Sequence, residues 1–448
     1  MTGNHDVAIA GAGLGGLAAA IFLRKAGLSV LCIEPEPFPR ARVGESLDWS
    51  SPRLLQELGL SREFLIDQQI ATYKRNIQIS PWGGSTWIAQ PEEWFRSRPI
   101  GFEIMTLHVD RAELDLRLYH RAEEAGAEFV WDRVAHVHTH DDRVIELTTG
   151  TGRRITAAWF LDNSGQARLF ARAFRIPKID YGQRKVCLWT YFNCSPRNQG
   201  TSFYADTAND EYLTWIWEIP ITPSTLSVGC VMPAWRVKQQ SQNGVDVDAI
   251  LRQELLKYPR LAKLLEQQQA LQISRCAFRN YVSESACGAN WLMIGESASL
   301  PDPLTANGVT ACFRHAREST RLIQAAFGRR SLSVKQQTLY NSRVRHMGHA
   351  FNHSIETSIY DWPIRKGLGA LPSQKIYTAF SYSINALYTR FAPEGWITTR
   401  LFQLLLYAVG VWMESWAFAG RIASWFRRSF KPQILSSHST PVGNKYEV

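Results

Sequence analysis

The chain of 448 residues lacks the cysteine patterns of a disulfide-stabilised scaffold or a structural zinc module. Its seven cysteines are odd in number, scattered, and never spaced as Cys-x-x-Cys. This usage argues against a disulfide framework and against a zinc site. The first residues also lack the basic and then apolar stretches of a secretory signal, so we expect a reducing, cytoplasmic setting.

Charge of one sign is not concentrated in any segment. The chain has 50 Lys and Arg against 40 Asp and Glu, a formal net charge of +10. The basic residues are dispersed and no nucleic-acid-binding signature occurs, so we expect no nucleic-acid partner. An anionic cofactor, an acidic carrier protein or a membrane surface are the partners that this charge favours.

Long apolar runs are missing from the C-terminal part. Residues 401–413 are uncharged and mostly apolar, but thirteen residues are too few for a bilayer span, which needs about 20. We interpret residues 331–431 as a helical cap over the active site, with peripheral membrane contact as the alternative. Residues 432–448 are polar and are predicted to be a flexible tail.

No metal site or hydrolase triad is predicted. Two groups of histidines occur, at positions 136, 138 and 140 and at positions 346, 349 and 353. The first group precedes a two-aspartate turn and is typical of an exposed hairpin tip. The second shares a helix face without a carboxylate or cysteine at ligand spacing, which favours a packed or substrate-facing helix.

The composition is that of a globular protein rich in aromatic residues. Hydrophobic residues make up 45% and charged residues 20%, which excludes a disordered chain. Aromatic residues reach 12%, with 16 Trp. This surplus suits a protein that binds flat ligands, although a bulky core would also account for it.

A dinucleotide-binding fingerprint opens the chain. An apolar strand at residues 7–10 is followed by a glycine-rich turn, a helix at residues 17–26 and a second strand that ends at Glu34. This order of elements, with the acidic residue at the end of the second strand, makes the glycine pattern informative. It predicts a nucleotide cofactor, NAD or FAD, in preference to a glycine turn without a ligand.

Each residue of the fingerprint has a physical role. Gly11 allows the tight turn, Gly13 lets the backbone approach a pyrophosphate, and Gly16 lets the helix pack closely on the strand. The helix N-terminus would stabilise the phosphate charge. Glu34 would accept hydrogen bonds from ribose hydroxyls.

Four later segments, in their order along the chain, resemble those of flavoprotein monooxygenases and their relatives, which bind FAD. They are residues 40–46, 108–115, 160–165 and 291–303. The resemblance implies FAD as the cofactor and further contacts from Glu45, Ser46, Arg111, Gly295, Glu296 and Asp302. The family usually has Asp at the position of Glu296.

The middle of the chain narrows the resemblance to flavin-dependent halogenases. Trp215 and Trp217 alternate in a W-x-W-x-I-P stretch, so they share one face of a strand. This stretch resembles the halogenase signature, although Thr214 stands where the family usually has Gly. Residues 226–231 resemble the strand that follows it in the family. An ordinary aromatic core strand is the alternative.

Lys74 is the predicted catalytic residue. In halogenases, a lysine in a segment of this kind lies between flavin and substrate. The resemblance implies that reduced FAD, oxygen and halide give hypohalous acid, which an amine must steer to the substrate by hydrogen bonding or as a haloamine. Burial would lower the lysine pKa and assist either role. An exposed strand lysine beside Arg75 is the alternative.

A turn after Asp302 is predicted to bind the halide. Relatives have a D-P-x-x-S-x-G-V turn here, and backbone N–H groups at such a turn can hold an anion. Thr305, Asn307 and Gly308 are the candidates. Ala306 and Asn307 replace the usual hydroxyl residues, so the backbone donors are kept and the hydroxyl is lost.

The predicted fold is α/β, with a doubly wound, Rossmann-like FAD-binding domain, an interleaved mixed-sheet substrate domain and a helical C-terminal extension. Residues 1–75, 109–180 and 286–330 are assigned to the FAD-binding domain. Residues 76–108 and 181–285 are assigned to the substrate domain. Residues 331–431 are the cap and residues 432–448 the tail.

The predicted function is halogenation of an electron-rich aromatic compound with FADH2, oxygen, and chloride or bromide. The tryptophan motif resembles that of phenol and pyrrole halogenases, some of which act on carrier-bound substrates. Only one dinucleotide fingerprint is present, so a separate flavin reductase is expected to supply FADH2. The alternatives are an FAD-dependent monooxygenase or oxidoreductase of the same fold, and a membrane-associated flavoprotein without catalysis.

Overall fold

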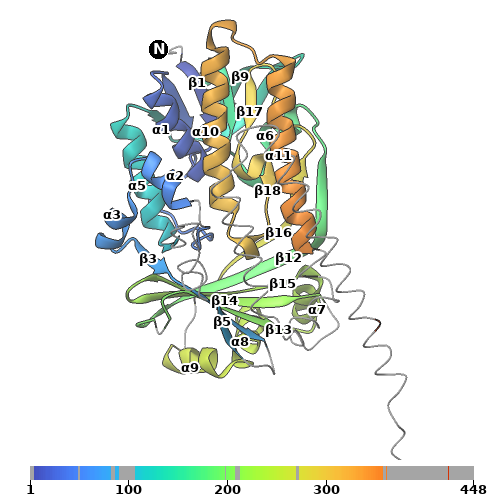
Figure 1. Ribbon diagram of the computed structural model, residues 1–448. Helices are drawn as coiled ribbons and strands as arrows, with labels where there is room; N and C mark the ends of the chain where they lie inside the picture. Colours follow the sequence, from blue (N-terminus) through green and yellow to red (C-terminus); the bar gives the residue numbers. More distant parts are fainter. Residues whose placement is uncertain are drawn as a thin grey trace, which may run out of the picture.

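The computed structural model describes residues 5–48, 51–81, 86–89, 106–196, 198–206, 212–268, 272–356, 360 and 422. Figure 1 shows these residues as two stacked bodies, one built on a parallel sheet and one on a large, mostly antiparallel sheet. Long strands and connecting segments join the two bodies, and the candidate site lies where they meet.

A five-stranded parallel sheet forms the centre of the first body. Its strands are short and almost entirely apolar, as expected for strands that are covered on both faces. Their spatial order is β17 (Trp291–Met293), β11 (Ala157–Asp162), β1 (His5–Ala10), β2 (Val30–Ile33) and β7 (Glu128–Val130). All four strand pairs are parallel, and β1 lies between β11 and β2, as in the Rossmann-like sheet predicted from the glycine fingerprint.

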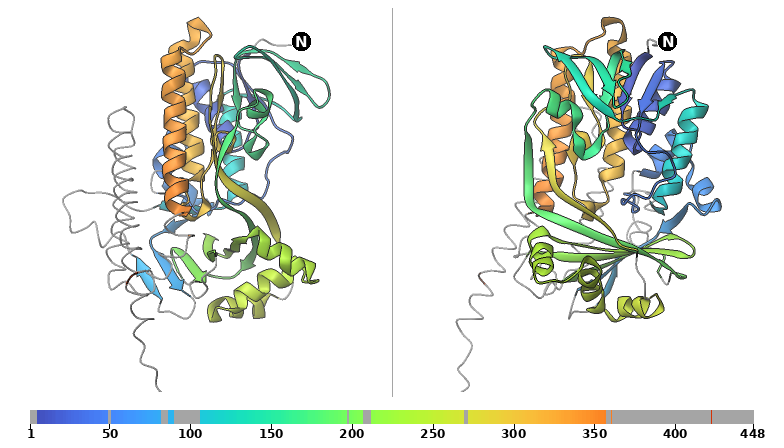
Figure 2. Two further views of the ribbon diagram at one scale, coloured as in Figure 1. Left: turned by 90° about the vertical axis from the view of Figure 1, so that its right-hand side faces the viewer. Right: turned by 180° about the vertical axis from the view of Figure 1, so that it is seen from behind.

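Helices cover one face of this sheet and a small antiparallel sheet covers the other (Figure 2). α1 (Leu14–Lys25) packs between α5 (Arg111–Glu124) and α10 (Gly308–Ala326). The opposite layer consists of β8 (Val134–His140), β9 (Arg143–Thr149) and β10 (Arg154–Ile155). Residues of α10 spaced three and four apart are buried, so its apolar stripe faces the core.

The second body is an eight-stranded sheet in the order β18-β16-β12-β15-β14-β13-β4-β5. All its pairs are antiparallel except β13 with β4. The strands are β4 (Ile77–Pro81), β5 (Trp87–Ala89), β12 (Lys178–Asn193), β13 (Thr201–Asp206), β14 (Thr214–Thr222), β15 (Thr225–Pro233), β16 (Ser274–Ser283) and β18 (Ser299–Leu300). The long strands β12 and β16 run from this sheet up along the first body (Figure 1).

Side chains of the second sheet alternate between two cores, because successive residues of a strand point to opposite faces. Ile216 and its neighbours pack under α7 (Ala234–Gln242), α8 (Val247–Leu256) and α9 (Pro259–Gln267). Trp215 and Trp217 lie in the other core, which faces the parallel-sheet body. The shared face that the sequence predicts for the two tryptophans is therefore present.

Shorter elements connect the bodies. β3 (Ala71–Lys74) and β6 (Thr106–Val109) form a two-stranded antiparallel ribbon. α2 (Ser51–Glu57) and α3 (Arg62–Asp67) precede the ribbon, and α6 (Leu169–Ala173) follows β11. Single 3-10 turns occur at Gly165–Ala167, Gly295–Ser297, Pro303–Thr305 and Phe327–Arg329.

The α/β fold with two interleaved sheets and a helical extension is confirmed, and the exact domain limits remain predictions. α11 (Val334–Ile355) begins the helical extension. The apolar run at 401–413 and the tail at 432–448 lie outside the described residues. Among the helices that are described, none has the length and apolar character required to cross a membrane.

The two histidine groups lie on the kinds of element that their spacing predicts, a hairpin strand and a helix. Residues 136, 138 and 140 lie on the exposed β8–β9 hairpin. His349, on α11, accepts or donates a hydrogen bond with the Tyr181 hydroxyl at 2.8 Å. Within the part of the chain that is described, no group of three His, Cys, Asp or Glu side chains could hold a metal ion.

Gly229 makes room for the tryptophan face. It pairs with Trp217 on β14 and with Trp189 on β12. A Cβ atom at Gly229 would lie 2.2 Å from the Trp217 ring and 2.7 Å from the Trp189 Cβ. No side chain other than hydrogen fits between the two tryptophans at this position.

We expect Gly229→Ala to destabilise the protein by about 1–3 kcal/mol, because the added methyl group overpacks a filled core. The measurement is the free energy of unfolding from denaturant titration. Gly328→Ala is the matched control, since a Cβ atom at Gly328 meets no atom within 4 Å. Equal stability of the two variants would contradict this packing.

Candidate functional site

The glycine turn between β1 and α1 is shaped by backbone contacts. Gly11 has φ +98, and a Cβ atom there would lie 2.5 Å from the carbonyl oxygen of Asn163. A Cβ atom at Gly16 would lie 2.1 Å from the carbonyl oxygen of Gly11. The absence of a side chain, predicted at Gly11 for the tight turn and at Gly16 for close helix-to-strand packing, is therefore required by the fold itself.

The N-terminus of α1 suits a phosphate group. Gly13 is the N-cap, it offers no side-chain cap, and the first turn contains no acidic residue. The first N–H groups of a helix have no intrahelical partner and carry a partial positive charge. A Cβ atom at Gly13 would meet only the Asn163 Nδ2 atom, at 3.2 Å. Gly13 is thus open for a ligand where Gly11 and Gly16 are not.

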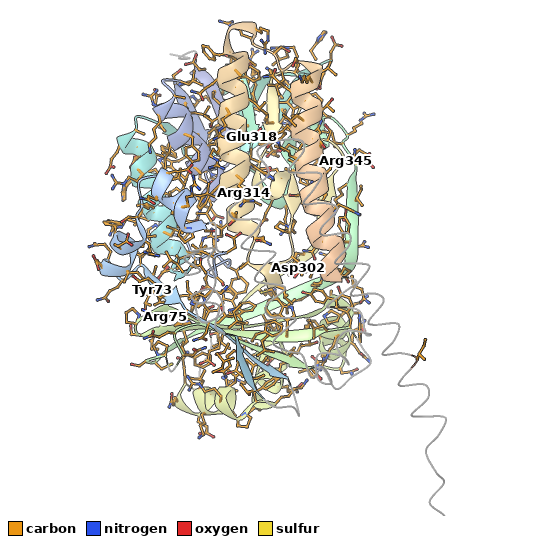
Figure 3. All side chains as sticks on the ribbon, viewed as in Figure 1. Tyr73, Arg75, Asp302, Arg314, Glu318 and Arg345 are labelled. Carbon is orange, nitrogen blue, oxygen red and sulfur yellow. The ribbon has the colours of Figure 1, made fainter. Side chains whose placement is uncertain are left out.

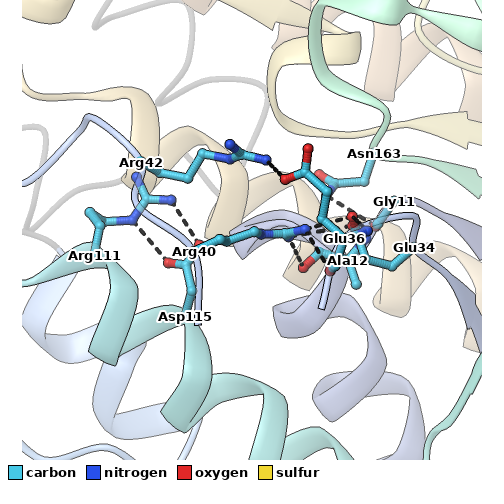
Figure 4. A network of polar contacts seen from close by, with 9 residues as sticks. All are labelled: Gly11, Ala12, Glu34, Glu36, Arg40, Arg42, Arg111, Asp115 and Asn163. Atoms are coloured by element: carbon cyan, nitrogen blue, oxygen red, sulfur yellow. Dashed lines mark hydrogen bonds and ion pairs between the residues drawn. The ribbon is translucent and has the colours of Figure 1, made fainter. Parts of the chain in front are cut away.

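Glu34 lies at the end of β2, directly beside this turn (Figure 4). Its Oε2 atom accepts a hydrogen bond from the Ala12 N–H at 2.7 Å, and its Oε1 atom accepts one from Arg40 at 2.5 Å. Arg40 also donates to the Ala12 carbonyl oxygen and stacks on the Phe38 ring. A ribose bound to Glu34 would therefore share the carboxylate with Arg40, for which the sequence predicts no individual role.

Arg111, at the start of α5, closes the other side of the turn region. Its guanidinium forms two parallel hydrogen bonds to Asp115, at 2.9 and 3.1 Å, and donates a third to the Val43 carbonyl oxygen at 2.8 Å (Figure 4). It therefore holds the segment that contains Glu45 and Ser46. Glu296, in the 3-10 turn after Gly295, has an exposed side chain. Gly295 has φ +59, and a Cβ atom there would lie 2.8 Å from the Cys312 sulfur.

Lys74 is buried at the end of β3, with 6% of its surface exposed. Its Nζ atom donates a hydrogen bond to the Ser46 hydroxyl at 2.9 Å. Burial lowers the pKa of Lys74 to about 8, and the nearby Asp48 carboxylate opposes this shift. An exposed strand lysine, the alternative considered above, is excluded.

The ribbon that carries Lys74 is attached to the tryptophan strand. The Thr72 hydroxyl donates a hydrogen bond to the carbonyl oxygen of Pro220, on β14. His108, opposite Thr72, is fully buried, and burial lowers its pKa well below the ordinary value, so its ring is neutral. Lys74 is therefore positioned next to the W-x-W-x-I-P strand without a charged histidine.

Trp217 is linked to Glu45 by a buried hydrogen-bond chain. The Trp217 indole N–H donates to the Ser227 hydroxyl at 3.0 Å, and that hydroxyl donates to the Glu45 carboxylate at 2.6 Å. Burial raises the pKa of Glu45 to about 7, although the hydrogen bonds from Ser227 and Tyr191 favour the charged form. Because Glu45 and Ser46 are neighbours in sequence, Trp217 and Lys74 are both tied to one short segment.

Trp215 begins a second chain, which ends on Asp302. Its indole N–H donates to the Tyr360 hydroxyl at 2.9 Å, and Tyr360 donates to the Asp302 carboxylate at 3.1 Å. Lys185, fully buried on β12, lies 3.4 Å from Asp302 and 3.1 Å from Glu356. Figure 3 places Asp302 where the first body meets the large sheet.

The halide candidates lie at the N-terminus of α10. Ala306 has φ +57, Asn307 is the N-cap without a side-chain cap, and Gly308 is the first helical residue. Asn307 is buried, and neither polar atom of its side chain has a hydrogen-bond partner within the described residues. A helix N-terminus and an unsatisfied amide at the same place suit a small anion. Thr305 shares this turn, in the 3-10 helix Pro303–Thr305.

The predicted residues form two groups. The fingerprint glycines, Glu34 and Arg111 surround the α1 N-terminus, whereas Lys74 and the tryptophans lie between the two bodies. Sequence reasoning missed the residues that tie them together: Arg40, Asn163, Ser227 and Lys185. Arg40, Asn163 and Ser227 lie within segments 40–46, 160–165 and 226–231, for which the sequence indicated a family resemblance, whereas Lys185 lies outside them. Ser227 and Lys185 are ordinary strand residues whose role depends on cross-strand neighbours.

We expect Gly13→Val to fold but to lose FAD, because its side chain would occupy the space next to the α1 N-terminus that a pyrophosphate needs. The measurement is the flavin absorbance that remains per protein after gel filtration, together with the circular dichroism spectrum. Gly328→Val is the control at an open glycine. Full flavin retention by Gly13→Val would show that the turn does not bind the pyrophosphate.

Comparison with known proteins places this site in a family. The family model described as tryptophan halogenase matches residues 6–98 and 103–358. A 1H-pyrrole-2-carbonyl-[peptidyl-carrier protein] brominase of Pseudoalteromonas luteoviolacea is 26% identical over 331 residues, which cover 72% of this chain and 78% of that one. The corresponding chlorinase of Pseudomonas fluorescens is 26% identical over 378 residues, covering 76% and 80%.

A relative with a different activity is also similar. A menaquinone reductase of Mycobacterium tuberculosis is 26% identical over 347 residues, covering 72% of this chain and 77% of that protein. Among solved structures, a flavin-dependent brominase aligns with TM-score 0.71 and 21% identity, covering 91% of this chain and 99% of that one. This structural likeness supports the fold.

The family match spans both bodies, including the glycine turn, Lys74, the tryptophan strand and the α10 turn. The expected FAD-dependent oxidoreductase with a halogenase fold is confirmed at the level of the family, whose named relatives include flavin-dependent halogenases. The chain belongs to the tryptophan halogenase family.

Proposed function

We propose that this protein halogenates an electron-rich aromatic ring and that Lys74 transfers the halogen. The single observation that supports Lys74 most strongly is its burial: an amine with pKa about 8 lies at the junction of the two bodies, hydrogen-bonded to Ser46. A surface lysine would remain protonated at neutral pH, whereas this one has an accessible neutral form.

Bound FAD, once reduced, would supply the oxidising chemistry that converts oxygen and halide into hypohalous acid. The glycine turn, Glu34 and Arg111 are the residues that would hold the nucleotide. Gly11 and Gly16 shape the turn, while Gly13 leaves it open at the helix N-terminus. Glu45, Ser46, Gly295 and Glu296 are proposed to lie along the remainder of the cofactor.

The proposed step at Lys74 requires only hypohalous acid and the aromatic substrate. The neutral amine attacks the halogen of hypohalous acid, forms an N–halogen bond and releases water. The aromatic ring then takes the halogen and loses a proton, which restores the amine. Ser46 positions the amine by accepting its hydrogen bond, and Asp48 stabilises the protonated form between turnovers.

Trp215 and Trp217 are proposed to separate the substrate from the flavin. Their rings are 5.8 Å apart and only 4% and 5% exposed, respectively. Each indole N–H is committed to a buried chain that ends on a carboxylate, so the rings are fixed in orientation. Two aromatic rings held in this way would keep water and substrate away from the flavin, so that the halogen reaches the substrate through Lys74.

The α10 N-terminus is proposed as the halide site, with Thr305, Asn307 and Gly308 around it. The buried Asn307 amide supplies an N–H donor in place of the hydroxyl that relatives have. Chloride or bromide would fit a site built from N–H donors. Asp302 lies just before this turn and is proposed to position it, because its carboxylate also accepts a hydrogen bond from the Leu304 N–H at 3.0 Å.

The substrate is proposed to be a phenol, pyrrole or indole, either free or attached to a carrier protein. The brominase and chlorinase relatives are named for a pyrrole on a peptidyl-carrier protein, which supports the carrier-bound form. A net charge of +10 suits an acidic carrier. A separate reductase is proposed to deliver FADH2, in a cytoplasmic setting.

A second candidate function is FAD-dependent oxidation or hydroxylation. The similarity to a menaquinone reductase supports it. Mass spectrometry distinguishes the two: the purified protein is incubated with FADH2, oxygen, bromide or chloride, and a panel of phenols, pyrroles and indoles. A product that gains halogen only when halide is present supports halogenation, and a product that gains oxygen without halide supports the second candidate.

We expect Lys74→Ala to bind FAD and consume oxygen but to lose halogenated product by about a hundredfold or more, because hypohalous acid is no longer positioned. Lys74→Arg should fail equally, since a guanidinium stays protonated. The measurement is product formed per oxygen consumed.

Lys178→Ala is the matched control, because Lys178 is an exposed lysine on β12. It should retain wild-type yield. Halogenation by Lys74→Ala at the wild-type ratio would remove the transfer role of Lys74.

We also expect the product-to-oxygen ratio to rise with pH. With a pKa of about 8, the neutral amine is about a tenth of the population at pH 7 and half at pH 8, so the ratio should rise about fivefold over that interval. Oxygen uptake in the same samples corrects for any effect of pH on the flavin reaction. A ratio that falls with pH would mean that the ammonium acts by hydrogen bonding. A ratio that does not change with pH would mean that the protonation state of Lys74 does not control halogen transfer.

A further inference from the structure

Two free cysteines lie directly opposite each other in the large sheet. Cys187 on β12 is the register partner of Cys276 on β16, in an antiparallel pair. They are 89 positions apart in the sequence (276 − 187), so no local spacing marks them as a pair. Their thiols are in hydrogen-bonding contact.

The strand geometry allows a bond between them. Residues directly opposite in an antiparallel pair have Cα atoms about 4.5–5.5 Å apart. Disulfides join cysteines whose Cα atoms are about 4.4–6.8 Å apart. The two cysteines therefore meet this distance requirement in the native sheet, without a shift of either strand.

The two thiols differ in access and in acidity. Cys187 is buried in the core that holds the tryptophans, whereas Cys276 is half-buried on β16. In the described part of the chain, the far side of β16 pairs with β18 only at Tyr281 and Val282, so the strand edge is open at Cys276. The hydrogen bond with Cys187 lowers the pKa of the Cys276 thiol, while burial raises that of Cys187. Cys276 is thus the thiol that an oxidant reaches first.

We propose that Cys187 and Cys276 form a reversible redox site that a small peroxide oxidises to a disulfide. The Cys276 thiolate attacks one oxygen of hydrogen peroxide, giving a sulfenic acid and hydroxide. The Cys187 thiol then attacks the sulfenic sulfur, forming the S–S bond and releasing water. Two electrons pass from the thiols to the peroxide, and a dithiol reductant reverses the reaction.

The position of the pair connects it to the tryptophan face. Across the sheet, Cys276 is opposite Cys187, Cys187 is opposite Val231, and Val231 is opposite Trp215. Cys187, Val231 and Trp215 belong to one buried cluster, and Cys276 packs against it. The dithiol is therefore at the end of the row of side chains that contains Trp215, and its oxidation would lock β12 to β16 at that row.

The experiment treats the reduced, purified protein with a small excess of hydrogen peroxide in the absence of flavin and substrate, so its outcome does not depend on the proposed function. Free thiols are then alkylated and counted by intact mass. We expect the count to fall from seven to five and a non-reduced digest to contain a peptide pair linking Cys187 to Cys276. Dithiothreitol should restore seven.

Cys276→Ser and Cys187→Ala should each abolish the linked peptide pair, and the less buried Cys276→Ser serves as the decisive variant if Cys187→Ala folds poorly. Cys194→Ser is the matched control, because Cys194 is also half-buried but lies outside this pair. It should leave the Cys187–Cys276 link intact. Sulfinic acid at Cys276 without a link, or no change in either thiol, would overturn the proposal.

Discussion

The hydrogen bonds of Glu45 and Ser46 join the two bodies of this protein. Ser46 accepts from Lys74, and Glu45 accepts from Ser227 on the large sheet. Arg111, on α5 of the first body, holds the same segment through a hydrogen bond to the Val43 carbonyl oxygen. One short stretch of chain thus sets the distance between the glycine turn, the Lys74 amine and the tryptophan face.

Burial determines the chemistry of this junction. The same loss of water raises the pKa of Glu45 to about 7 and lowers that of Lys74 to about 8. A carboxyl and an amine with these values can both change protonation near neutral pH. On the surface neither group would do so, because Asp, Glu and Lys then titrate far from pH 7.

The tryptophan face shows how packing and polarity are combined. The Trp217 ring occupies the space that Gly229 leaves free on the neighbouring strand β15. The indole N–H of Trp217 donates a hydrogen bond to the hydroxyl of Ser227, which lies two residues before Gly229 on β15. Trp215 depends on Tyr360, which connects it to Asp302 and Lys185. The packing of the two tryptophan rings therefore depends on the buried hydrogen bonds, because each ring carries an N–H group that needs a partner once it is buried.

Local sequence patterns determined much of the fold and the chemical class of the site. Glycine spacing and short apolar runs were sufficient for the β1–α1–β2 unit, because turns and strand alternation depend on neighbouring residues. The resemblance of the tryptophan and Lys74 segments to a known family correctly indicated a flavin-dependent halogenase fold. Tertiary structure alone decided that Lys74 is buried and that Arg40 hydrogen-bonds to Glu34. It also decided that Ser227 contacts Glu45 and that Lys185 contacts Asp302. It also brought together Cys187 and Cys276, because cross-strand register depends on the whole sheet and leaves no mark on local spacing.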